Sequence, residues 1–140
     1  MKSKFTSIIK VRKQQMDKIE TLLAKARLKK SELKKQLALT REDIENTTVP
    51  TSGTISKMTV FREKLDILRN EKLRLDEDLL IQRAEVKQFQ EQYKKAHIEY
   101  EKIKYLQEQE FAEWMQKIKK QEQRDLDEVS NMLFVNKDLN

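Results

Sequence analysis

Two long runs of apolar residues, spaced alternately three and four apart, flank one short polar segment at residues 46–54. A strict alternation of three and four steps places the apolar residues along one seam of a coiled coil. The polar segment contains the only proline of the chain, Pro50, and the only glycine, Gly53, and a proline prevents a helix from continuing. The pattern predicts an all-α fold, a two-helix antiparallel coiled-coil hairpin with an overhanging longer second helix.

The seam of each helix can be read from this spacing. We expect one elongated domain over residues 1–140, with helix one at about 4–46, the tip at 47–55, helix two at about 56–134 and a frayed C-terminus at 135–140. The predicted seam of helix one consists of Phe5, Ile9, Arg12, Met16, Ile19, Leu23, Ala26, Lys30, Leu33, Leu37, Thr40 and Ile44. That of helix two consists of Met58, Phe61, Leu65, Leu68, Lys72, Leu75, Leu79, Gln82, Val86, Phe89, Tyr93, Ala96, Tyr100 and Ile103.

An antiparallel hairpin that folds back near Thr51 pairs residues whose numbers add to a constant. A sum of about 102 pairs seam residues throughout, for example Leu23 with Leu79 and Leu37 with Leu65, although registers seven residues away fit the same spacing. In this register helix two has no partner from about Ile98 onward. A four-residue stutter would then bring Phe111, Met115 and Ile118 onto the seam.

The composition excludes several classes of function. A chain with one glycine cannot build a phosphate-binding loop, which needs several. Because the chain has no cysteine and only one histidine, it has neither a zinc site of the Cys/His type nor a thiol nucleophile. General acid–base catalysis needs a pocket that a two-helix rod does not provide. We therefore expect no enzyme, no cofactor, no metal and no small-molecule substrate. No run of about 20 apolar residues and no secretory signal are present, so we expect a cytoplasmic protein.

The positive charge is concentrated in helix one. Residues 1–46 hold 13 Lys and Arg against 6 Asp and Glu, while the whole chain carries a net charge of +6. The basic N-terminal residues alternate with apolar ones, which suits contact with an acidic protein, an anionic membrane or phosphate, and equally suits a solvated helix face. Lys30 within the seam is either an anion-attracting notch or a side chain whose ammonium reaches water. The near-neutral second helix argues against nucleic acid as a partner.

The overhang carries the residues most typical of a protein interface. Trp114 with Phe111, Met115 and Ile118 forms an aromatic and aliphatic cluster, and Trp is strongly enriched where interfaces concentrate binding energy. The alternative is that two copies of the overhang pack together in a four-helix arrangement.

The basic first helix, short polar tip and longer second helix together resemble the FliJ family of flagellar type III export proteins. This resemblance implies a non-enzymatic stalk that is similar to the coiled coil of the rotary ATPase gamma subunit and lies in the cytoplasm at the inner face of the cell membrane. It implies that the stalk links a hexameric export ATPase to the cytoplasmic domain of the export gate and promotes ATPase assembly and substrate export. Export chaperones are a further implied partner.

The resemblance assigns two sets of contact residues. The spacing of Phe61, Leu65 and Leu68 is similar to the gate-contacting positions of the family, and Gln36 and Leu37 resemble the facing stretch of helix one. The paired termini of family members enter the ATPase ring, which here implies contact through Lys2, Lys4, Phe5, Lys10, Arg12, Lys13, Phe111, Trp114, Met115 and Ile118.

Two other classes of function fit the same pattern. A cytosolic coiled-coil adaptor or prefoldin-like chaperone would form a defined oligomer through the overhang. Binding of nucleic acid through helix one, independent of its base sequence, would weaken steeply with salt.

Overall fold

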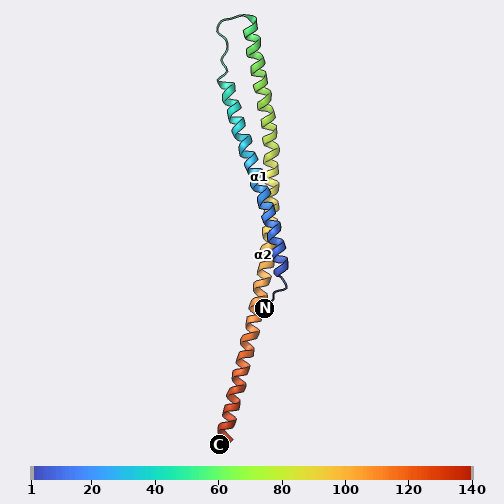
Figure 1. The fold of residues 1–140 in the computed structure, drawn as a ribbon, viewed down its shortest axis with the longest axis vertical. Helices are drawn as coiled ribbons and strands as arrows, with labels where there is room; N and C mark the ends of the chain where they lie inside the picture. Colours follow the sequence, from blue (N-terminus) through green and yellow to red (C-terminus); the bar gives the residue numbers. More distant parts are fainter. Residues whose placement is uncertain (1, 140) are drawn as a thin grey trace. The chain divides into compact units, whose positions relative to one another are not determined.

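The fold comes from a computed structural model, which describes residues 2–139 and the side chains as far as residue 137. It is all-α and has two helices, α1 at Thr6–Glu45 and the longer α2 at Ile55–Leu139 (Figure 1). The expected fold class is confirmed. Helix α2 runs on to Leu139, where the sequence suggested fraying from residue 135. Neither helix is long and apolar enough to cross a membrane over the residues described.

The chain divides into two compact units, and each contains part of both helices. Unit 1 is formed by Met1–Gln15 and Ala96–Asn140, and unit 2 by Met16–Lys95. Unit 2 holds the connection between the helices, and unit 1 holds both chain termini.

The ends of the helices follow from capping chemistry. The Ser3 hydroxyl oxygen accepts a hydrogen bond from the backbone N–H of Phe5 at 3.1 Å, which satisfies a donor at the start of α1. At the other end, the Thr47 hydroxyl donates to the Asp43 carbonyl oxygen at 2.6 Å. Gly53 has a φ of +146°, a conformation that side-chain-bearing residues rarely adopt, just before α2 begins.

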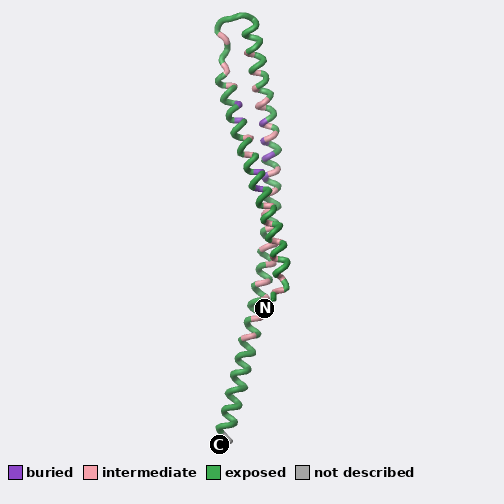
Figure 2. Tube along the Cα trace, viewed as in Figure 1, coloured by how far each residue is buried: buried purple, intermediate pink, exposed green. Residues whose placement is uncertain are grey.

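The predicted seam of α1 is confirmed, because all twelve of its positions are buried or half-buried and every other position of α1 is exposed (Figure 2). In α2 the predicted seam is likewise covered, except at Met58, which is 38% exposed. The alternation of three and four steps therefore identified the packed face of both helices.

The fully buried side chains form two clusters in unit 2. One contains Leu23, Ala26 and Val86, and the other contains Leu37, Leu75 and Leu79. Phe89 and Tyr93 pack against the first cluster, and Leu33 packs against the second. Between the clusters lies a polar residue of the seam, Gln82, which is 3% exposed and donates from Nε2 to the Ala26 carbonyl oxygen at 3.1 Å.

The expected pairing register is wrong. Leu37 packs with Leu75 and Leu79 instead of Leu65. Ala26 and Gln82, whose numbers add to 108, are hydrogen-bonded, and Arg41 and Asp76, whose numbers add to 117, form an ion pair at 3.8 Å. The helices are thus shifted by roughly one to two heptads from the register in which the numbers add to 102.

The tip accounts for this shift. Residues 46–54 are not helical, and an extended chain advances about 3.3 Å per residue against about 1.5 Å in a helix. The connection can therefore run along the first turns of α2, so that α1 ends beside a later part of that helix (Figure 1). Met58 lies in these first turns, which explains why it is not covered as its seam position predicted.

Candidate docking surfaces

All ten residues implied for the ATPase ring belong to unit 1. In this unit the N-terminal segment lies against α2 near Gln107 and Glu110. Polar contacts join these segments. The Ser3 hydroxyl donates to Glu110 Oε2 at 3.4 Å, and Gln107 Nε2 donates to the Thr6 hydroxyl oxygen at 3.5 Å. Both pairs have numbers that add to 113, so the shift of register found in unit 2 is also present here.

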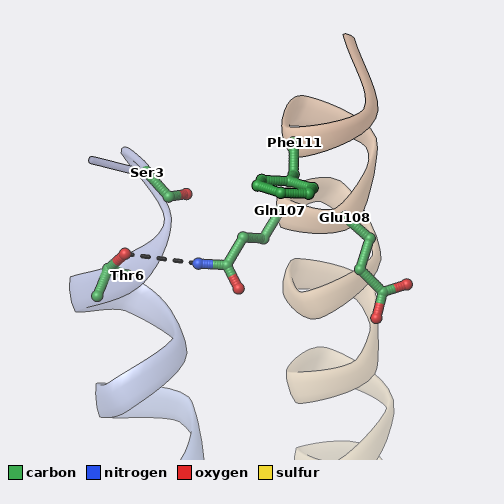
Figure 3. A pocket seen from close by; sticks show the side chains of 5 residues that line it. All are labelled: Ser3, Thr6, Gln107, Glu108 and Phe111. Atoms are coloured by element: carbon green, nitrogen blue, oxygen red, sulfur yellow. Dashed lines mark hydrogen bonds between the residues drawn. The ribbon is translucent and has the colours of Figure 1, made fainter. Parts of the chain in front are cut away.

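A groove opens at this junction (Figure 3). Ser3 and Thr6 line it from the N-terminal segment, and Gln107, Glu108 and Phe111 line it from α2. Figure 3 shows the amide of Gln107 reaching across to Thr6 and the ring of Phe111 one turn further along, while the Glu108 carboxylate points away from the N-terminal segment. The groove is therefore lined by two hydroxyl groups from the N-terminal segment and by an amide, a carboxylate and an aromatic ring from α2.

The cations at the start of α1 face solvent. Lys2, Lys4, Lys10 and Lys13 are exposed, and the Lys4 ammonium lies 5.2 Å from the ring centroid of Phe5. This distance allows a cation–π interaction, which holds one positive charge above the half-buried ring. Of the predicted basic set only Arg12 is half-buried, as its seam position indicates.

The aromatic cluster of unit 1 is also largely accessible. The rings of Phe111 and Trp114 are 5.7 Å apart and tilted by 41°, within the range that favours aromatic pairs. Phe111 is 53% exposed and Met115 is 37% exposed, whereas Trp114 and Ile118 are half-buried. The cluster presents apolar surface to solvent while its rings support each other.

The expected stutter is wrong at Phe111 and Met115. The covered positions after Ile103 are Gln107, Glu110, Trp114 and Ile118. The alternation of four and three steps holds as far as Trp114, and Ile118 follows after a second step of four. The spacing of apolar residues could not identify Gln107 and Glu110, because both of these are polar. Counting the heptad onward from Ile103 without regard to residue type would have found them.

The overhang begins later than expected. It was placed from about Ile98, but the N-terminal segment reaches as far along α2 as Glu110 and Phe111. From residue 119 to residue 137 every side chain is exposed. This exposed arm, defined as residues 119–137, includes the apolar residues Leu126, Val129, Met132, Leu133, Phe134 and Val135, each more than half exposed.

The residues implied for the export gate all lie in unit 2. Gln36 is exposed, while Phe61, Leu65 and Leu68 are half-buried. Leu37 is 4% exposed and packs with Leu75 and Leu79 rather than beside the other members of the set. The structure therefore does not bring these five residues into one surface.

Among the described residues, no three acidic or histidine side chains gather closely enough to hold a metal ion.

A comparison with protein families matches residues 1–139 to the family model described as Flagellar FliJ protein. Comparisons with curated proteins and with solved structures gave no match.

Proposed function

The chain belongs to the flagellar FliJ family, and we propose that it links a hexameric export ATPase to the cytoplasmic domain of the export gate. The family consists of non-catalytic stalk components of the flagellar export apparatus. The proposal adds the two specific partners, and it places the protein in the cytoplasm at the inner face of the cell membrane, with export chaperones as further partners.

Unit 1 carries the observation that most strongly supports ring contact. Exposed lysines at the start of α1 belong to the same unit as the accessible Phe111 and Trp114 pair. A buried contact in a protein ring requires apolar anchors, and electrostatic attraction accelerates the approach to that ring. A stalk that contacts the six subunits unequally would bias their conformations by binding some of them more tightly than others.

The gate contact rests on a smaller surface. Phe61, Leu65 and Leu68 are only half-buried, and the nearby Met58 is 38% exposed because α1 does not reach it. The first turns of α2 can therefore offer apolar surface to a partner, whereas the exposed Gln36 belongs to a separate part of unit 2. Leu37 is too deeply buried to take part directly.

Truncation of the aromatic pair tests the ring contact. We expect Phe111→Ala combined with Trp114→Ala to weaken binding to the cognate export ATPase by at least about tenfold, because truncation of an interface anchor commonly costs 2 kcal/mol or more. The measurements are pulldown of the ATPase and stimulation of its ATP hydrolysis. Leu28→Ala combined with Leu39→Ala, which truncates two exposed apolar side chains of unit 2, is the control. Unchanged stimulation by the aromatic double variant would exclude this contact.

The basic residues should affect association more than dissociation. Lys10→Glu combined with Lys13→Glu should lower the association rate with the ATPase and reduce its dependence on ionic strength, because exposed charges act mainly by steering. Stopped-flow measurements at several salt concentrations check this. An association rate equal to that of the unmodified chain at low salt would contradict it.

A second candidate function, an oligomeric chaperone or adaptor, is favoured by the apolar side chains of the exposed arm. Size-exclusion chromatography with light scattering separates the two. The stalk proposal expects a monomer at micromolar concentration, and the chaperone alternative expects a defined oligomer.

A further inference from the structure

Adjoining hollows follow one side of the paired helices in unit 2. Two hollows share the side chain of Lys34 and together run along α1 from Arg27 to Arg41, a length of about 21 Å at ~1.5 Å per residue. We call this surface the basic groove. Its other wall is formed by residues of α2 between Asp76 and Gln90.

The charges on the walls of this groove are strongly unbalanced. Its cations are Arg27, Lys30, Lys34, Arg41 and Arg83, and its single carboxylate is Asp76. Arg41 pairs with Asp76 at 3.8 Å. Within residues 2–137, the other four cations make no ion pair within 4 Å, so a net charge of about four remains along the groove.

The opposite side of the same helices shows no such excess. The hollow there is lined by one cation, Lys29, and one anion, Asp78, together with Leu33, Ile81 and Gln82. Asp78 already pairs with Arg74 at 3.4 Å. Because both sides belong to the same two helices, the excess is a property of one face and does not simply reflect the basic composition of α1.

Apolar surface accompanies the cations. The floor of the basic groove is closed by Leu37, Leu79 and Val86, whose burial fixes the spacing of the helices. On its α2 side Leu80 is 69% exposed, and Leu73, seven residues earlier on the same helical face, is 60% exposed. Solvated lysines and arginines alone do not require such residues, and exposed leucines next to them suit a partner that has its own apolar stripe.

We propose that the basic groove docks an acidic amphipathic helix of another protein. A helix laid along the groove would place apolar side chains on Leu80 and Leu73 and carboxylates beside Arg27, Lys30, Lys34 and Arg83, which is the usual mode of helix recognition in a groove. Nucleic acid and anionic lipid would also be attracted by the cations, but neither one uses the exposed leucines beside the groove.

The observed register explains why Lys30 lines the basic groove. In the expected register Lys30 faced Lys72, which would have weakened a seam layer. In the structure Lys30 lines the groove together with Val86 and Gln90. Of the two interpretations of this seam lysine, the groove favours the anion-attracting one. The surface is separate from the ring contacts, all of which lie in unit 1.

The test uses the full chain and a designed peptide. The probe is a fluorescently labelled peptide of about 20 residues, with leucines at alternate three and four spacing and glutamates on both flanks. Its control has every glutamate replaced by lysine. Fluorescence anisotropy should show micromolar binding of the acidic peptide and none of the basic one. Single-stranded DNA and vesicles containing phosphatidylserine are measured in parallel.

Matched variants locate the binding. Arg27→Glu combined with Lys34→Glu should weaken peptide binding at least tenfold. Lys25→Glu combined with Lys35→Glu makes the same change of charge on exposed residues of α1 outside the groove, and should change it less than threefold. Leu80→Gln, which removes no charge, should weaken it about threefold. Circular dichroism confirms that each variant is folded.

Three results would overturn the proposal. The first is the absence of acidic-peptide binding at 1 mM chain. The second is equal weakening by the two charge-reversal variants, which would reflect net charge alone. The third is DNA or vesicle binding as tight as that of the peptide and lost in the same groove variant.

Discussion

Unit 2 and unit 1 use the same two helices but pack them differently. Every buried side chain of the described chain lies in unit 2, including Leu75 at 1% and the other members of the two apolar clusters. In unit 1 the seam is at most half-buried, and the junction is made by the Ser3–Glu110 and Thr6–Gln107 contacts. Apolar burial of about 25 cal/mol per Å² therefore stabilises unit 2 far more than unit 1.

This difference follows from the residues on the two seams. In unit 2 the seam is mainly apolar and forms two buried clusters, and its polar members include Gln82, whose amide is hydrogen-bonded. In unit 1 the seam includes Arg12, Ala96, Gln107 and Glu110, which are either charged, small or polar. A loosely closed end with exposed aromatic and apolar side chains is suited to docking, because little internal packing has to be given up when a partner covers it.

The largest expected effect tests the core of unit 2. Leu75→Ala should lower the free energy of unfolding by about 2–5 kcal/mol, since it leaves a cavity at the most buried position. Leu73→Ala, two residues away and 60% exposed, should change it by less than about 0.5 kcal/mol. Chemical denaturation followed by circular dichroism measures both. Equal losses in the two variants would mean that the seam of unit 2 is not the main source of stability.

Hydrogen exchange compares the two units directly. Amides of residues 6–15 and 96–111 should exchange through local openings that cost on the order of 1–2 kcal/mol less than those of residues 23–40 and 75–86, because fewer apolar contacts close them. Mass spectrometry with peptide resolution can measure this. Equal protection in both units would mean that apolar packing does not make unit 2 more stable than unit 1.

The same comparison shows what could be read from the sequence. The seam positions and the fold class followed from spacing alone, because packing requires apolar residues at regular intervals on one face. The register did not, since heptads repeat every seven residues and the nine-residue connection allows α1 to end beside several turns of α2. The positions of Gln107 and Glu110 were missed because a seam that uses hydrogen bonds has no hydrophobic signal.

The candidate sites were predictable to different degrees. The basic N-terminus and the Phe111 and Trp114 pair share one unit because an antiparallel hairpin places the start of α1 beside a late part of α2. Burial of Leu37 depends on register, so spacing alone could not separate it from the more accessible Leu65 and Leu68. The basic groove depends on the pairing register, because the register decides which residues of α2 lie beside Arg27, Lys30 and Lys34, and spacing alone leaves the register open.

Replacing a polar seam residue by leucine should change the free energy of unfolding by different amounts in the two units, and by less than the loss of Leu75. Gln82→Leu should raise the free energy of unfolding by about 1 kcal/mol, because the amide is fully buried and leucine would extend the apolar layers. It should also allow other pairing registers, because a single polar seam residue helps to specify one of them. Gln107→Leu should raise it by less than about 0.5 kcal/mol, since this residue is only half-buried and its 3.5 Å contact with Thr6 is long. Denaturation midpoints compare the two variants, and a larger gain at Gln107 would reverse the ranking.

The smallest expected effect concerns the exposed Arg74–Glu71 ion pair of unit 2. The hydrogen bond from Arg74 lowers the pKa of the Glu71 carboxyl below its ordinary value. A carboxyl whose pKa is depressed in the folded state contributes stability that is present above its unfolded pKa and is lost as the pH falls through the folded pKa. Glu71→Gln should therefore reduce stability slightly at pH 7, and the difference from the unmodified chain should vanish in strongly acidic solution. Because both side chains are solvated, salt should diminish the difference as well. Thermal unfolding at several pH values and salt concentrations measures it, and a difference that persists at acidic pH would show that Glu71 acts through packing rather than through its charge.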